Sequence, residues 1–159
     1  MSKDRTGRCT CGEVVYRLTD DPIIVHACHC TWCQRETGSA FVLNGVIEPE
    51  RVELVRGAPV TVDLATASGG IQRVRRCPGC QVALWSTFPR DGAEPFAYVR
   101  MGTLEDTSGV VPGVHIFTST KQPWLELPAD GTPVFEGFYR PSEVLPPALH
   151  ARFRAALGK

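Results

Sequence analysis

The hydrophobic positions of this chain alternate over short distances and only rarely follow a helical period. β-Branched and aromatic residues gather in short runs that are separated by Gly, Pro, Asn and Asp. An early strand is expected from Gly7, ahead of a tight corner at residues 9–12. The same pattern predicts further short strands at residues 14–19, 22–27, 40–46, 52–55, 60–64, 71–75, 82–86, 96–101 and 114–118.

Two segments depart from this strand pattern and predict helices. Residues 30–37 fit a short helical turn that ends at Gly38, because a left-handed helix cap favours glycine. Residues 147–157 carry large apolar side chains at four-residue spacing, which predicts one amphipathic helix with an apolar stripe at Leu149, Phe153 and Leu157.

The chain length and the absence of internal repeats indicate a single domain. A chain of 159 residues can bury one sizeable core, and no linker or charge block divides it. Residues 121–141 are rich in proline and predict an ordered loop that wraps the domain. We therefore expect one mainly β domain over residues 1–159, with a short helical turn and one C-terminal helix.

The charge balance narrows the class of partner. Seventeen basic and seventeen acidic residues give a formal net charge of zero, which argues against nucleic acid and against an anionic membrane surface as partners. No apolar run approaches the roughly 20 residues that span a bilayer, and the N-terminus lacks the apolar segment of a signal peptide. We expect a cytoplasmic protein, in which thiols stay reduced.

Seven cysteines dominate the candidate chemistry of the chain. An odd number of thiols in a reducing compartment favours metal or redox chemistry over a paired disulfide framework. The cysteines fall into two pairs and one triplet: Cys9/Cys11, Cys77/Cys80 and Cys28/Cys30/Cys33.

The spacing of the cysteines suggests how they divide between two zinc sites. An extended C-x-C segment directs both thiols to one side, and the Pro-Gly centre of the CPGC motif predicts a type II turn. Structural zinc sites are closed by four protein ligands, whereas catalytic sites keep three and an exchangeable position. We therefore assign a closed structural site to Cys9, Cys11, Cys77 and Cys80, and an open site to Cys28, Cys30 and Cys33.

Other interpretations of the thiols remain open at this point. A competing partition combines the two C-x-x-C pairs, Cys30/Cys33 and Cys77/Cys80. The triplet could be a redox pair, a set of buried thiols, or a second structural zinc site completed by His26 or His29. A protein of this last kind would be a non-catalytic binding module in which zinc serves only folding.

The cysteine motifs together resemble one known family. The segments GRCTCGEVVY at residues 7–16, CHCTWCQRETGS at 28–39 and CPGC at 77–80 resemble the glutathione-dependent formaldehyde-activating enzymes, also called the centromere protein V-like family. The likeness continues through residues 102–104, 115–117, 119–124 and 127–128. It implies a zinc-stapled β-tent fold, the same division of the cysteines, and carbon–sulfur lyase activity on S-hydroxymethylglutathione.

An open three-thiol zinc site also suggests roles for its neighbours. Its vacant position could take a substrate thiol, and the adduct with an aldehyde then needs a proton donor, for which the candidates are His115, Thr37 and Ser39. A glutathione carboxylate needs a cation, for which the candidates are Arg35, Arg73 and Lys121. Trp32 lies beside the triplet and could line a substrate cleft or shield the site from solvent.

Overall fold

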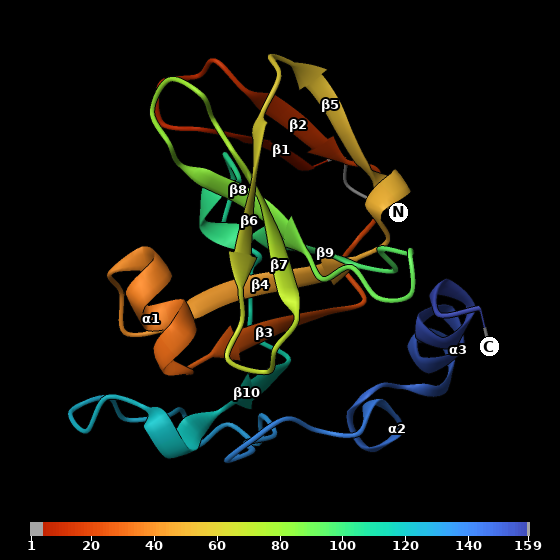
Figure 1. The fold of residues 1–159 in the computed structure, drawn as a ribbon. Helices are drawn as coiled ribbons and strands as arrows, with labels where there is room; N and C mark the ends of the chain where they lie inside the picture. Colours follow the sequence, from red (N-terminus) through yellow and green to blue (C-terminus); the bar gives the residue numbers. More distant parts are fainter. Residues whose placement is uncertain (1–4, 159) are drawn as a thin grey trace. The chain divides into compact units, whose positions relative to one another are not determined.

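The computed structural model of this chain describes residues 5–158 and is mainly β (Figure 1). Its strands are β1 (Arg5–Arg8), β2 (Val15–Leu18), β3 (Ile24–Cys28), β4 (Val42–Ile47), β5 (Val52–Arg56), β6 (Val60–Ala65), β7 (Ile71–Arg76), β8 (Ala83–Thr87), β9 (Ala97–Arg100) and β10 (Val114–Ile116). Its helices are α1 (Thr31–Thr37), α2 (Pro141–Val144) and α3 (Pro147–Ala156), with 3-10 turns at Pro49–Arg51, Met101–Thr103 and Thr118–Thr120. The mainly β class is confirmed.

The described residues divide into two compact units. Residues 5–22 and 45–109 form the first unit, and residues 23–44 and 110–158 form the second. Each unit is built from segments that are distant in the sequence, and β4 runs from the second into the first. Among residues 5–158, no helix combines the length and the apolar content that crossing a bilayer requires.

The first unit consists of antiparallel strands. One sheet has the order β1-β2-β5, and a second ladder runs β6-β7-β8-β9 (Figure 1). In β2 the side chains of Tyr16 and Leu18 are fully buried, whereas Arg17 between them faces outward and pairs with Glu53 of β5. This alternation is the period-two pattern from which the strand was predicted.

Strand β7 shows how a weak hydrophobic pattern is completed by a polar contact. Ile71 is 46% exposed and Val74 is fully buried, so these two apolar residues lie on opposite faces as the sequence indicated. Gln72 fills the buried face beside Val74, and its amide donates to Ser86 Oγ of β8 at 3.1 Å. A buried amide is tolerated in the core because it has this partner.

The second unit places a late strand beside the cysteine triplet. Strand β10 pairs in parallel with β3, and its register sets His115 opposite Ala27 and Ile116 opposite Cys28. The buried side chain of His26 in β3 also meets Tyr139 Oη at 2.7 Å, which ties the C-terminal part of the unit to the same strand.

The structure corrects two details of the sequence prediction and bears out the position of the C-terminal helix. The strand expected at residues 114–118 ends at Ile116, because Phe117 adopts a left-handed backbone with φ 55° and a 3-10 turn follows. The proline-rich segment ends in a short helix, α2, which begins with Pro141 at its first position. Helix α3 is present where expected, although none of its residues is fully buried.

Gly7 provides a test of the packing in the first unit. Gly7 lies opposite Tyr16 in the β1–β2 pair, and a Cβ at this position would overlap the buried Tyr16 ring. We expect Gly7→Ala to lower the free energy of unfolding by about 1–3 kcal/mol through overpacking. Urea denaturation measures this change, and Gly109→Ala is the control because an added Cβ there meets nothing within 4 Å. Equal stability of the two variants would contradict the prediction.

Candidate metal centres

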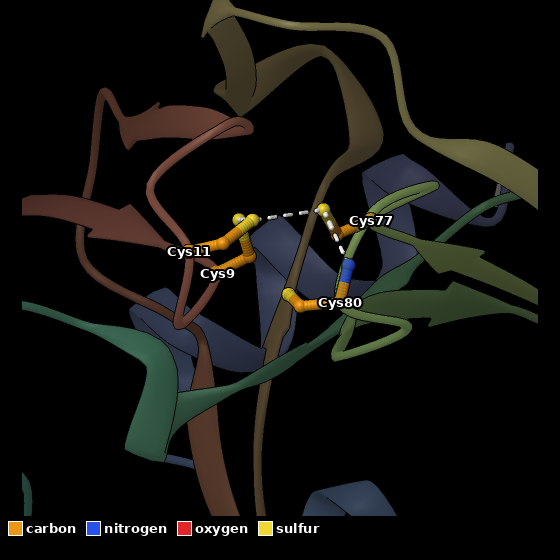
Figure 2. A group of neighbouring side chains, drawn as sticks. All are labelled: Cys9, Cys11, Cys77 and Cys80. Carbon is orange, nitrogen blue, oxygen red and sulfur yellow. Dashed lines mark hydrogen bonds between the residues drawn. The ribbon is translucent and has the colours of Figure 1, made fainter.

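Four cysteines of the first unit converge from two loops. Cys9 and Cys11 lie in the corner between β1 and β2, and Cys77 and Cys80 lie in the turn between β7 and β8. Figure 2 shows their sulfur atoms turned toward the space between the two loops, and all four lie within 4.8 Å of one another. Cys11 Sγ is 3.5 Å from Cys9 Sγ and 3.6 Å from Cys77 Sγ. We call this group the four-thiol site.

Local hydrogen bonds shape each of these loops. In the first loop, the Gly12 amide donates to the Cys9 carbonyl at 3.1 Å. The Val14 amide donates to Cys9 Sγ at 3.3 Å. In the second loop, the amide of Cys80 bonds to Cys77 Sγ at 3.5 Å. Such N–H···S bonds leave the sulfur lone pairs directed into the loop and stabilise negative charge on sulfur.

The turn at residues 77–80 differs from the predicted type II turn. A type II turn needs a positive φ at its third residue, but the positive φ falls on Gln81, at 60°, and not on Gly79. Gly79 instead lies against a side chain of the other loop. A Cβ there would overlap the carboxylate of Glu13, which also lies 3.6 Å from Cys77 Sγ.

The three cysteines of the second unit lie where β3 meets α1. Cys28 ends the strand, Cys30 is the N-cap of the helix and Cys33 lies in its first turn. The Cys30 sulfur accepts the Cys33 amide at 3.3 Å, and Gly38 closes the helix with the predicted left-handed cap, at φ 67°. The three sulfurs lie within 4.8 Å of one another, and we call this group the three-thiol site.

The close contacts among the three thiols shift their pKa values in opposite directions. Hydrogen bonds from Cys28 and Cys33 lower the pKa of the Cys30 thiol, because they stabilise its thiolate. The same contacts raise the pKa of Cys28 to about 12 and also raise that of Cys33. Without a metal, therefore, only one of the three crowded sulfurs readily carries charge.

Zinc fits both groups of thiols. Tetrahedral zinc with Zn–S bonds of about 2.3 Å sets neighbouring sulfurs roughly 3.8 Å apart. The observed separations are 3.5 Å for Cys28–Cys30, 3.5 Å for Cys9–Cys11 and 3.6 Å for Cys11–Cys77. The groups follow the four-plus-three division of the preferred partition, and the competing pairing of the two C-x-x-C motifs does not describe them.

His29 turns away from the thiols on either side of it and contacts another histidine. Its fully buried ring stacks on His115, with His29 Nε2 at 3.0 Å from His115 Nδ1. Burial lowers the pKa of both rings, to about 4 for His29, so each is neutral near pH 7. His115, a candidate proton donor, is thus linked by one hydrogen bond to the residue between Cys28 and Cys30.

The other two candidate proton donors already donate to the backbone. Thr37 Oγ1 donates to the Cys33 carbonyl at 2.8 Å, and Ser39 Oγ donates to the Phe41 carbonyl at 2.6 Å. A hydroxyl has a single proton to donate, so both are occupied at the C-terminal end of α1.

A groove of about 420 Å³ lies along α1 in the second unit. One side of the groove is formed by residues of α1 and its cap. These residues are three and four positions apart, so they lie on a single face of the helix. The residues that line the groove are Thr31, Gln34, Arg35, Gly38, Ser39, Ala40, Gln122 and Trp124. Trp124, which lines this groove, is 70% exposed.

The candidate binding residues differ in their surroundings. Arg35 lines the groove, is exposed, and makes no ion pair with another described residue. Lys121 is half-buried and donates to the carbonyls of Gln122 and Leu125. Arg73 belongs to the first unit and already pairs with Asp63 and Glu94. Trp32 is half-buried on α1 and does not line the groove.

Loss of one ligand tests the role of the four-thiol site. The site joins loops whose cysteines are 66 residues apart, and structural zinc contributes roughly 10 kcal/mol or more to small domains. We expect Cys77→Ser to lower the free energy of unfolding by at least about 3 kcal/mol, measured by urea denaturation of the metal-loaded protein. The control is Thr10→Ala, which changes a residue of the loop that carries Cys9 and Cys11 but leaves all four sulfurs in place. A Cys77→Ser chain as stable as this control would exclude a structural metal.

Several known proteins are similar to this chain. A family described as "Glutathione-dependent formaldehyde-activating enzyme" matches residues 4–120. A Fusarium vanettenii protein named "Putative glutathione-dependent formaldehyde-activating enzyme" is 26% identical over 150 residues, which cover 93% of this chain and 71% of that protein. A crystal structure of a Rhodobacter sphaeroides protein has a TM-score of 0.45 at 20% identity, covering 67% of this chain and 91% of that one. Because the family match spans most of the chain and includes all seven cysteines, the protein belongs to the glutathione-dependent formaldehyde-activating enzyme family.

Proposed function

We propose that this protein is a zinc-dependent carbon–sulfur lyase that acts on a thiol–aldehyde adduct, either S-hydroxymethylglutathione or a related small molecule. The observation that carries the proposal is the three-thiol site, whose sulfurs suit a metal ion and offer it three protein ligands. Catalytic zinc sites keep a fourth position for an exchangeable ligand. Family membership supports an enzyme over a binding module in which zinc serves only folding.

The proposed division of roles follows the two groups of thiols. Cys9, Cys11, Cys77 and Cys80 hold a structural zinc, and Cys28, Cys30 and Cys33 hold the catalytic one. Both units are needed, and we propose that residues 1–159 act as one functional domain. The family match supports this reading, because residues 4–120 include segments of both units.

The zinc ion, when bound to the three thiols, supplies a Lewis-acid position that lowers the pKa of a substrate thiol. Cleavage of the adduct breaks its carbon–sulfur bond, and the sulfur keeps the bonding electrons. The hydroxyl oxygen becomes the aldehyde carbonyl and releases its proton to a base. Joining of the thiol to the aldehyde follows the same path in reverse and needs an acid at that position.

His115 is the residue we propose for this proton transfer. Its ring is neutral near neutral pH because burial lowers its pKa, so it can accept the hydroxyl proton. Its Nδ1 contact with His29 fixes the ring orientation, since both rings are buried. Thr37 and Ser39, whose protons are donated to carbonyls, are secondary candidates.

The groove along α1 is the place we propose for the remainder of the substrate. Arg35, which has no ion-pair partner among residues 5–158, offers a cation for a carboxylate, and Trp124 offers an exposed aromatic face in the same groove. Lys121 and Trp32 are less suited, because the Lys121 ammonium already binds two carbonyls and Trp32 lies outside the groove. A thiol with a carboxylate-bearing peptide body would match these groups.

Substitution of one thiol tests whether the three-thiol site is catalytic. We expect Cys30→Ser to reduce adduct cleavage and formation by at least about 100-fold, since even partners outside the metal ligands cost 10–100-fold. Turnover is followed with formaldehyde and glutathione, and stability by urea denaturation. Unfolding of Cys30→Ser comparable to that of Cys77→Ser would show that the triplet is structural and would remove the enzyme interpretation.

Substitution of Arg35 tests the proposed substrate class. A hydrogen bond to a carboxylate in an exposed groove is expected to contribute roughly tenfold to binding, so Arg35→Gln should raise KM about tenfold and leave kcat nearly unchanged. Steady-state kinetics measures both constants. Arg154→Gln is the matched control, because Arg154 is an exposed arginine of the same unit outside the groove. Equal KM values for the two variants would exclude Arg35 from substrate binding.

A further inference from the structure

A glutamine directly follows the last cysteine of the 28–33 motif and the last cysteine of the 77–80 motif. Each glutamine side chain donates a hydrogen bond to a backbone carbonyl of its own loop. Gln34 follows Cys33, and its amide nitrogen donates to the carbonyl of His29 at 2.7 Å. Gln81 follows Cys80, and its amide nitrogen donates to the carbonyl of Pro78 at 2.7 Å. In both loops the acceptor belongs to the residue directly after the first cysteine of the motif, Cys28 or Cys77.

Gln34 makes more contacts than its counterpart. Its amide nitrogen also donates to the Thr120 carbonyl at 2.9 Å, and its amide oxygen accepts from Gln122 Nε2 at 2.7 Å. Two carbonyl oxygens can be satisfied only by the nitrogen of the amide, so the orientation of the Gln34 side chain follows from its surroundings. The amide therefore joins α1, the loop of the triplet and the segment after β10.

His29, which separates Cys28 from Cys30, is held at each end of its peptide unit. Its amide donates to the Ile116 carbonyl at 3.0 Å, and its carbonyl accepts from both Gln34 and Thr120 Oγ1, the latter at 3.1 Å. These bonds set the direction of the backbone between two thiols whose sulfurs are 3.5 Å apart.

We propose that Gln34 is a positioning residue that sets the metal affinity of the three-thiol site through the carbonyl of His29. The proposal rests on the metal-binding part of the proposed function. A site with three protein ligands must order a flexible loop with fewer bonds to the metal than a site with four. Hydrogen bonds that order the loop before the metal binds should therefore contribute more to metal affinity at the three-thiol site. The single bond from Gln81 should contribute less to metal affinity at the four-thiol site.

The substitution Gln34→Glu isolates the hydrogen-bond donor. Glutamate keeps the size of the side chain but would set carboxylate oxygens against the carbonyls of His29 and Thr120. Partners outside the ligand set typically change metal affinity by 10–100-fold, and we expect a loss in this range at the three-thiol site only. Gln34→Met removes the donor without adding charge and should weaken the same site.

Gln81→Glu is the matched control in the same chain. It changes the same residue type by the same charge, at the equivalent position of the other cluster, and removes a bond of the same length. It should leave the affinity of the three-thiol site unchanged, and any weakening should fall on the four-thiol site.

Metal binding gives a readout that does not depend on activity. A mild chelator first removes metal from the three-thiol site of the full chain and leaves the four-thiol site loaded. Cobalt(II) is then titrated into this protein against a competing chelator, and the thiolate-to-cobalt absorption reports occupancy of the three-thiol site. The Cys30→Ser variant shows which step of the titration belongs to the three-thiol site. Hydrogen exchange at the His29 amide, which should accelerate in Gln34→Glu, reports the ordering of the loop before cobalt is added, while the four-thiol site stays loaded.

The outcomes separate this proposal from the function on which it rests. Selective weakening of the three-thiol site by both Gln34 variants supports the proposal, provided that urea unfolding is unchanged in the chain that carries metal only at the four-thiol site. Equal affinities for wild type and Gln34→Glu overturn it and leave the proposed function intact. Weakening by Gln34→Glu but not by Gln34→Met also overturns it, because charge and not the donor would then be the cause. A wild-type chain that binds no cobalt at the three thiols overturns the proposed function as well.

Discussion

Sulfur atoms held a few ångströms apart cannot all carry negative charge without a cation between them. Both clusters bring thiols within 4.8 Å of one another, and their contacts already push individual thiol pKa values in opposite directions. A metal removes this conflict because it stabilises every thiolate at once, and its binding then contributes to folding. The loops, the helix cap and the hydrogen bonds around both clusters together direct several sulfurs to one point.

The two clusters meet this requirement by different routes. The four-thiol site draws on two loops that are far apart in sequence, and each loop brings two sulfurs in a tight turn of its own. The three-thiol site draws all its sulfurs from one strand end and one helix start. The His29 peptide beside it is bonded from two directions, at its amide by Ile116 of β10 and at its carbonyl by Thr120 of the segment after β10. Under the proposed assignment, the four-thiol site would stabilise its unit, whereas the three-thiol site would depend on its unit for its shape.

Helix α1 connects the thiols to the surface on which a substrate could lie. Cys33 points into the unit from one face of this helix, and Gln34 and Arg35 line the groove on the adjacent face. A substrate that placed its thiol at one face and its carboxylate at the other would span a single helical turn. Gln34 belongs to the groove and to the hydrogen bonds around His29, so it is a physical link between the two faces.

The sequence by itself determined the features that depend on local spacing. Short alternating runs marked the strands, Gly38 marked the end of α1, and cysteine spacing indicated the four-plus-three grouping because neighbouring residues set which sulfurs can face one point. Local spacing could not show that Gly79 makes room for Glu13, since that contact comes from a loop more than sixty residues earlier. It also could not show the His29–His115 pair or the partners of Gln34. Those contacts exist because β10 lies parallel to β3 in one register, and such a register is set only when distant segments pack together.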